Sequence, residues 1–242
     1  MSNQKRTKIV ATLGPACSST ETLKHMILEG VDVFRINFSH ADYSTVKENI
    51  QNIRKLSEEL GTHVAILGDL QGPKLRVGMM KQEVIVQPGD DNFPRDVNPG
   101  ERVLLDDGKL IFEVLETNNT NEVKVMVIQG GPLRSKKGVN LPNTNISLPA
   151  LTAKDKEDAI FAIEQKVDWL ALSFVRHAED LKELQALIEA HSEYKIPIIA
   201  KIEKPEAVEN IDRIIAYCDG LMVARGDLGV EVPAEEVPLI QK

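Results

Sequence analysis

The sequence predicts an α/β protein in which a series of βα units is interrupted by an all-β segment. Short runs rich in β-branched residues alternate with amphipathic stretches near both ends of the 242-residue chain. Between Leu75 and Ile146 the helical period is lost, and turn dipeptides separate runs of alternating polarity. Because alternating strands and helices are typical of a parallel sheet, we expect a parallel α/β domain with a small all-β domain inserted into it.

Three βα units are expected before the insertion. The pattern Ser18-x-x-Glu21 predicts a capping box at the start of a first helix, which ends near Gly30. A second helix ends near Gly61 and has one apolar face, formed by Val46, Ile50, Ile53 and Leu56. The strands expected in this part are Lys8–Thr12, Val31–Phe38 and Val64–Leu67.

The sequence of the insertion shows no helical period, so we expect strands and turns without helices there. Its alternating runs include Glu83–Val86, Arg102–Leu105 and Val123–Ile128. The turn signals around them are Asp107-Gly108, Asn118-Asn119 and Gly130-Gly131.

The βα pattern resumes after Leu148 with three more units. Thr152-x-x-Asp155 predicts the start of one helix, and Pro205 predicts the start of another that includes Ile211, Ile214 and Ile215. A helix over Ala178–Ala190 has Leu181, Leu184 and Ile188 on one face. The strands expected here are Trp169–Ser173, Ile198–Ile202 and Leu221–Val223.

The spacing of these units, roughly twenty to thirty residues, is that of a (β/α)8 (TIM) barrel, of which about six units are present. We divide the chain into a first barrel part at 1–74, the inserted β domain at 75–146 and a second, truncated barrel part at 147–242. A sixth helix is expected to begin at Gln241 and Lys242, so a closed barrel would need further residues.

Composition and charge exclude several classes of protein. The net charge of −8 argues against a nucleic-acid-binding surface. No stretch approaches the roughly 18 apolar residues of a membrane span, so we expect a cytoplasmic protein without a membrane partner. Cys17 and Cys218 are the only cysteines and are expected to be reduced thiols.

Polar and charged residues follow several predicted strands, where the catalytic groups of a (β/α)8 barrel lie. Glu203 and Asp227 follow adjacent strands and are candidate Mg²⁺ ligands. Lys201 lies two residues before Glu203, so both side chains point to the same side of the strand. There the lysine could offset charge on a phosphoryl group or an enolate oxygen. The alternative is a simple salt bridge between Lys201 and Glu203.

Three further sites have a functional and a structural interpretation. Arg35 could bind a phosphate through two hydrogen bonds, or it could pair with a carboxylate on the barrel rim. His40 is a candidate acid or base, although a lone loop histidine is more often structural. The basic loop Lys136-Lys137-Gly138 is either a solvated turn or a nucleotide contact on a closing lid.

The chain resembles the pyruvate kinase family over essentially its whole length. Seven blocks occur in the family's order: TKIVATLGPAC, FRINFSH, DLQGPKLR, KKGVNLP, LSFVR, AKIEKPEAVENID and MVARGDLGVE. The resemblance implies Mg²⁺-dependent phosphoryl transfer from phosphoenolpyruvate to ADP, which gives pyruvate and ATP in the last step of glycolysis. It also implies a homotetramer for the full-length protein.

The resemblance assigns roles to residues of the barrel. Arg35 and Lys201 would be catalytic and bind the transferring phosphoryl group. Glu203 and Asp227 would hold Mg²⁺. Gly226 and Asp227 would direct backbone amides at the carboxylate of phosphoenolpyruvate, at the start of a short helix.

The resemblance also implies a nucleotide site and a monovalent-cation site. Arg76 and Lys137 would contact the nucleotide, with Asn37 nearby. Potassium-dependent members usually carry Glu at the position of Lys74, whose ammonium can supply the charge of K⁺, so we expect an enzyme that works without K⁺. The family's K⁺ ligands map to Asn37, Ser39, Asp69 and the backbone of Leu70.

Two departures from the family pattern concern length. The inserted domain is shorter than the family's, and the shortfall falls around Gln87–Asn92. The last two barrel strands, the threonine that the family uses to protonate the enolate and the C-terminal regulatory domain lie outside these 242 residues.

Two rival interpretations remain open. A metal-dependent aldolase or lyase could form a pyruvate enolate on a similar barrel, but it would need neither a β lid nor the KKGVNLP block. A chain with six of eight units could instead be an inactive fragment with an open sheet edge.

Overall fold

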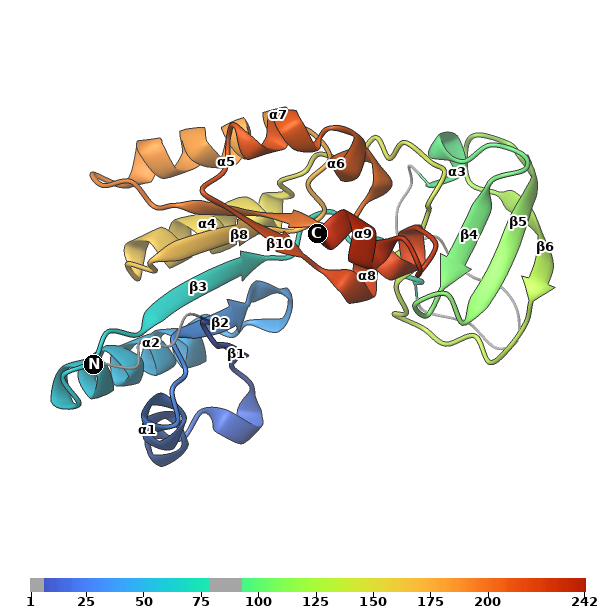
Figure 1. The fold of residues 1–242 in the computed structure, drawn as a ribbon. Coiled ribbons are helices and arrows are strands. Elements are labelled where there is room, and N and C mark those ends of the chain that lie inside the picture. Colours follow the sequence, from blue (N-terminus) through green and yellow to red (C-terminus); the bar gives the residue numbers. More distant parts are fainter. Residues whose placement is uncertain (1–6, 79–92) are drawn as a thin grey trace.

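A computed structural model of the chain describes residues 7–78 and 93–242. Its larger sheet has six parallel strands in the order β1-β2-β3-β8-β9-β10, and its strands curve like part of a barrel wall (Figure 1). These strands are β1 (Val10–Thr12), β2 (Val33–Asn37), β3 (Ala65–Leu70), β8 (Trp169–Leu172), β9 (Ile198–Ile202) and β10 (Gly220–Val223).

Helices cover the outer side of this sheet (Figure 1). The longer ones are α1 (Thr20–Leu28), α2 (Tyr43–Glu59), α4 (Ala153–Glu164) and α5 (Ala178–His191). The shorter ones are α6 (Pro205–Glu209) and α7 (Ile211–Ile215). Two more short helices, α8 (Arg225–Glu231) and α9 (Val237–Gln241), lie beyond the carboxyl end of β10 (Figure 1), and there are 3-10 turns at η1 (Pro15–Cys17) and η2 (Phe38–His40). No described helix combines the length and the apolar character that crossing a membrane requires.

The main core lies between the sheet and these helices. In β2, Phe34 and Ile36 are buried against the helices, as are Ile198 and Ala200 in β9. Because side chains alternate along a strand, the residues between them face the inner, concave side. The sequence therefore places Arg35 and the other odd-numbered residues of these strands on the side where a barrel has its site.

A second lobe is built on an antiparallel sheet with the order β6-β5-β4-β7 (Figure 1). Its strands are β4 (Arg102–Leu105), β5 (Leu110–Thr117), β6 (Val123–Gln129) and β7 (Val139–Asn140). A short helix, α3 (Phe93–Asp96), precedes them, so the expectation of an insertion without helices was wrong at this point. A separate core holds the lobe together: Val77, Val97, Val103, Leu105, Leu110, Val114 and Leu141. We call this unit the β lobe.

Two connections join the β lobe to the barrel part. In the first, the amide of Gly72 donates to Asp155 Oδ1 at 3.0 Å. In the second, the guanidinium of Arg176 donates to the carbonyls of Ile146 at 2.5 Å and Leu148 at 2.7 Å. Both connections are therefore fixed at their barrel ends by buried or half-buried polar side chains.

The fold class and most elements agree with the sequence predictions. The predicted strands Arg102–Leu105 and Ile198–Ile202 have the same bounds in the structure. Thr152 caps α4 at the predicted start of that helix and forms a capping box with Asp155. Cys17 and Cys218 are free thiols.

Some predicted boundaries were wrong. The cap of α1 is Ser19, which accepts from the amide of Thr22, whereas the hydroxyl of Ser18 donates to a carbonyl in the preceding turn. The helix expected from Pro205 is two short helices that meet at Asn210. The third strand extends to Leu70, beyond the predicted end at Leu67.

Helical structure near the end of the chain also begins earlier than expected. The sequence placed the start of a helix at Gln241 and Lys242, but α8 begins directly after β10 and α9 ends at Gln241. The predicted strand Glu83–Val86 and the predicted shortfall at Gln87–Asn92 lie outside the described residues.

Candidate active site

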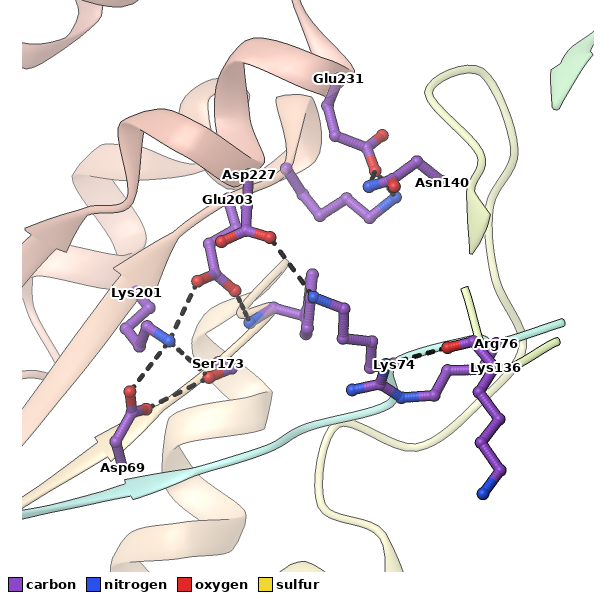
Figure 2. Close-up of polar contacts among 12 residues, drawn as sticks. Asp69, Lys74, Arg76, Lys136, Asn140, Ser173, Lys201, Glu203, Asp227 and Glu231 are labelled. Atoms are coloured by element: carbon purple, nitrogen blue, oxygen red, sulfur yellow. Dashed lines mark hydrogen bonds and ion pairs between the residues drawn. The ribbon is translucent and has the colours of Figure 1, made fainter. Parts of the chain in front are cut away.

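Lys201 lies at the centre of a polar cluster on the concave side of the sheet. Its ammonium donates to Ser173 Oγ at 2.8 Å and to Asp69 Oδ2 at 3.2 Å, and it lies 3.1 Å from Glu203 Oε1 (Figure 2). Only 7% of the residue is exposed. Three neighbouring strands supply these groups, so the arrangement depends on the parallel register of β3, β8 and β9.

Arg35 joins the same cluster from β2. Its Nε and Nη2 lie 2.6 Å and 2.5 Å from one oxygen of Asp69, and its Nη1 donates to Thr12 Oγ1 at 2.9 Å. Asp69 is 1% exposed and therefore holds two cations, Arg35 and Lys201, with little help from water. Arg35 thus has the contact with a rim carboxylate that was expected as the alternative to phosphate binding.

Glu203 is a buried carboxylate with an incompletely satisfied oxygen. Its Oε2 accepts from the amide of Phe174 at 2.9 Å. Its Oε1 pairs with Lys201 by distance, but it has no hydrogen bond within the described part of the chain. Burial raises the pKa of Glu203, Lys201 opposes that shift, and the negative charge of Asp227 adds to it.

Asp227 lies in the first turn of α8, after β10, and is closer to solvent. Its Oδ1 lies 3.6 Å from the ammonium of Lys74, which is also 5.7 Å from the centre of the Phe174 ring. Figure 2 shows Asp227 beside Glu203, with Lys74 on its other side. The two candidate metal ligands are thus neighbours, supplied by consecutive βα units.

These two carboxylates fit the role of a small metal site. One oxygen of Glu203 is buried without a hydrogen bond, and the charge of Asp227 acts on it. Among the residues that the structure describes, no group of three or more His, Cys, Asp or Glu is arranged to hold a metal. A pair of carboxylates suits Mg²⁺, which takes most of its other ligands from substrate and water.

Two of the three residues predicted to contact the nucleotide lie on the side of the β lobe. Arg76 pairs with Gly138 in an isolated bridge, and its Nη1 donates to the carbonyl of Lys136 at 3.3 Å. Lys137 forms an ion pair of 2.8 Å with Asp106. The structure therefore brings Arg76 and Lys137 to one end of the lobe, whereas Asn37 belongs to the barrel part.

The predicted K⁺ ligands are engaged in internal contacts. Asn37 Oδ1 accepts from the amide of Ser39 at 3.1 Å, and the carbonyl of Leu70 accepts from Ser173 Oγ at 2.6 Å. Lys74 pairs with Asp227, while Asp69 pairs with Arg35 and Lys201. His40 lies in η2, and its side chain is outside the described part of the structure.

Three contributors to the cluster were not predicted from the sequence. Ser173, Thr12 and the amide of Phe174 contact Lys201, Arg35 and Glu203 respectively. The predictions relied mainly on charged residues after each strand, and these groups are neutral. Ser173 could have been found, because it is the last residue of a predicted strand and the site was expected at the ends of the strands.

Comparisons with known proteins show the family to which the chain is similar. A family model described as the pyruvate kinase barrel domain matches residues 4–92 and 82–242. Pyruvate kinase 2 of Synechocystis sp. is 45% identical over 262 aligned positions, which cover 98% of this chain and 44% of that protein. The pyruvate kinase of Bacillus licheniformis is 44% identical, with coverage of 98% and 44%.

The pyruvate kinase of Corynebacterium efficiens is 42% identical over 99% of this chain and 54% of that protein. The chain thus spans about half the length of the relatives that it matches. The two stretches matched by the family model overlap at residues 82–92. With matches over nearly all of its length, the chain belongs to the pyruvate kinase family.

Proposed function

We propose that the chain carries the phosphoenolpyruvate and metal side of an active site that transfers a phosphoryl group to ADP, giving pyruvate and ATP. The observation that carries this proposal is the placement of Lys201. Its ammonium is held at the carboxyl ends of the strands among Asp69, Ser173 and Glu203. A buried cation beside the candidate metal ligand Glu203 is suited to offset negative charge on a phosphoryl group during its transfer.

The proposed mechanism rests on positioning and electrostatics. Lys201 and Arg35 would exchange part of their contact with Asp69 for the phosphoryl oxygens of the substrate. Glu203 and Asp227 would hold Mg²⁺, which when bound offsets the negative charge of the reacting phosphates. The backbone amides of Gly226 and Asp227, at the start of α8, would bind the substrate carboxylate.

We also propose how the chain is organised and where it acts. The barrel parts are 1–74 and 147–242, and the inserted domain at 75–146 presents Arg76 and Lys137 to the nucleotide. The family's place in glycolysis supports a cytoplasmic location, and its common assembly supports a homotetramer for the full-length protein.

The activity can be tested by a coupled assay for ADP-dependent formation of pyruvate, run beside an assay for aldol cleavage. Only the first is expected to be positive. The intact mass of the native protein defines the species assayed, since this chain alone has a mass of 26.8 kDa. We expect activity from a longer polypeptide of about twice that mass and negligible turnover from the 242-residue chain alone. Aldol cleavage without pyruvate formation would overturn the proposal.

Lys74 supports activity without K⁺. Its ammonium lies 3.6 Å from Asp227, so a fixed positive charge is already present at the site. We expect the rate of the active protein to be nearly unchanged when KCl is added to an assay free of Na⁺ and K⁺. The variant Lys74→Glu should then require K⁺. A strong rise in the rate of the unmodified protein on adding KCl would contradict this prediction.

A further inference from the structure

A second buried polar cluster joins the barrel part to the β lobe. The ammonium of Lys204 donates to Glu231 Oε1 at 2.9 Å, and the side-chain amide of Asn140 donates to the same oxygen at 2.8 Å. All three residues are buried. Lys204 and Glu231 belong to the barrel part and Asn140 to β7 of the lobe, so the two units share one acceptor atom. Figure 2 shows Glu231 and Asn140 meeting apart from the Lys201 cluster.

The position of this cluster along the chain ties it to the candidate active site. Lys204 directly follows Glu203. Glu231 lies on α8, one helical turn after Asp227. Asn140 is three residues after Lys137 and pairs with Leu104 in the lobe sheet. Each member is therefore rigidly connected to a residue proposed to hold the metal or the nucleotide.

Burial of such a cluster costs free energy, so its presence calls for a reason. Two buried charges lose their hydration, and an apolar pair of similar size would often hold two surfaces together at least as well. A shared polar acceptor restricts how the two units can be oriented, because both donors must approach one oxygen at hydrogen-bond distance. The connections to the lobe are fixed at their barrel ends by Asp155 and Arg176, which leaves the angle of the lobe to be set elsewhere.

We propose that Lys204, Glu231 and Asn140 form a latch that fixes the orientation of the β lobe, and that they act as positioning residues for the nucleotide. The second part rests on the proposed function. With the latch formed, Arg76 and Lys137 are held at a defined place relative to Lys201 and Asp227. Without it, the lobe keeps its own fold but occupies a range of orientations.

The first test measures the orientation of the lobe directly. Spin labels are placed at Lys124→Cys on the lobe and Glu59→Cys on the barrel part, in a background with Cys17→Ser and Cys218→Ser. Asn140→Asp replaces the donor with a carboxylate that faces Glu231 and should repel it. We expect a narrow distance distribution for the unsubstituted latch and a broad, shifted one for Asn140→Asp. Asn121→Asp, in an exposed loop of the same lobe, should leave the distribution unchanged.

A rescue variant separates the latch from a general loss of stability. Asn140→Asp combined with Glu231→Gln keeps one carboxylate, one amide and one lysine in the cluster, with the amide and the carboxylate exchanged. This double variant should restore the narrow distribution. Asn140→Ala, which removes the donor without adding charge, gives the same comparison if Asn140→Asp does not fold. An unchanged distribution in both single variants would overturn the latch.

The second test addresses positioning in the active protein. We expect Asn140→Asp to raise KM for ADP at least fivefold while KM for phosphoenolpyruvate changes less than twofold, because the substrate contacts lie on the barrel part. The rescue variant should reverse most of this increase. A broadened distance distribution with an unchanged KM for ADP would refute positioning but not the latch. The distance measurement needs no activity, so its result stands even if the proposed function fails.

Discussion

At the scale of single residues, the cluster around Lys201 is balanced in charge. Three cations, Arg35, Lys74 and Lys201, pair with three carboxylates. Within this described cluster, no surplus positive charge is left for a substrate that carries a phosphate and a carboxylate. Binding of an anionic substrate must therefore either displace internal pairs or bring additional positive charge, which a divalent cation between Glu203 and Asp227 would provide. The internal pairs hold the side chains near the positions that the reaction needs.

Replacing Lys201 tests its proposed role in phosphoryl transfer. Lys201→Met keeps the length and the apolar stem of the side chain but removes the charge. We expect kcat of the active protein to fall by about 10²–10³, the effect of removing one group that stabilises charge in the transition state. Lys195→Met is a matched control. Lys195 lies shortly before β9, the strand that carries Lys201, and it is exposed and pairs with Asp219. Comparable rates for Lys201→Met and Lys195→Met would contradict the assignment.

Replacing Glu203 tests the cost of its buried charge. Because its pKa is raised on folding, the folded state binds the proton more tightly than the unfolded state does. Its contribution to stability is complete below the unfolded pKa and is lost as the pH rises through the folded value. Glu203→Gln is neutral throughout, so without metal it should have a Tm about 2–4 °C higher near pH 7, the size of a 1 kcal/mol effect in a domain of this size.

The difference in Tm should shrink as the pH falls toward the ordinary pKa of a glutamate side chain, because Glu203 then becomes protonated and neutral as well. Thermal unfolding followed by circular dichroism across this range is a direct measurement. Gln retains an acceptor for the amide of Phe174, and Lys201 keeps Asp69 and Ser173. A lower Tm for Glu203→Gln at neutral pH would show that the ion pair with Lys201 outweighs burial. Activity should nevertheless be lost, because the candidate metal ligand is gone.

At the scale of elements, the connection after β3 depends on close contact with the end of β8. Gly72 has a φ of +67°, and a Cβ built there would lie 2.6 Å from the carbonyl oxygen of Ser173. Gly72→Ala combines backbone strain of about 1–2 kcal/mol with this clash against backbone, so we expect a loss of at least about 2 kcal/mol in the free energy of unfolding. Urea denaturation measures it.

Gly14→Ala is the control for this substitution. Gly14 has an extended backbone, and a Cβ there would have no atom within 4 Å. Its stability should change by no more than about 0.5 kcal/mol. Equal effects of the two substitutions would mean that the contact with Ser173 is not a constraint. Since Ser173 also contacts Lys201, Gly72→Ala should disturb the candidate site as well as the fold.

The sequence predicted these elements best where a local pattern is strong. The helical spacing of the apolar residues in α2 and the cap of α4 at Thr152 can both be read from residues close in the sequence. Ser18 and Ser19 are both good caps, and their neighbours do not decide between them; the hydroxyl of Ser18 is used by the preceding turn. The break at Asn210 between α6 and α7 likewise has no proline or glycine to mark it.

The candidate site was predictable only in part for a similar reason. In a (β/α)8 barrel the site lies at the carboxyl ends of the strands, and this rule identified Lys201, Glu203 and Asp227 from their positions alone. It could not predict that Asp69 pairs with both Arg35 and Lys201, because that depends on the register of neighbouring strands. The buried contact of Asn140 with Glu231 joins residues 91 positions apart and left no local signal.

At the scale of the whole molecule, the parallel sheet has two edges within the described residues. Strands β1 and β10 each have a hydrogen-bonded neighbour on one side only. Val10 on β1 and Leu221 on β10 are 48% and 43% exposed. Among the described strands of the β lobe, β6 is also an edge with exposed apolar residues, but its pairing with β5 has irregularities, and it carries Lys124. Such features blunt edge-to-edge pairing, whereas β10 has no charged residue.

We therefore expect the 242-residue chain, when produced by itself, to associate through the edges of the parallel sheet. Sedimentation velocity over a range of concentrations should show a shift toward larger species. Val10→Lys combined with Leu221→Lys places a charge on each edge and should reduce this shift. Val127→Lys on β6 should leave the shift largely unchanged. If Val127→Lys alone abolishes association, the chain associates through the edge of the β lobe. The prediction for the edges of the parallel sheet would then be wrong.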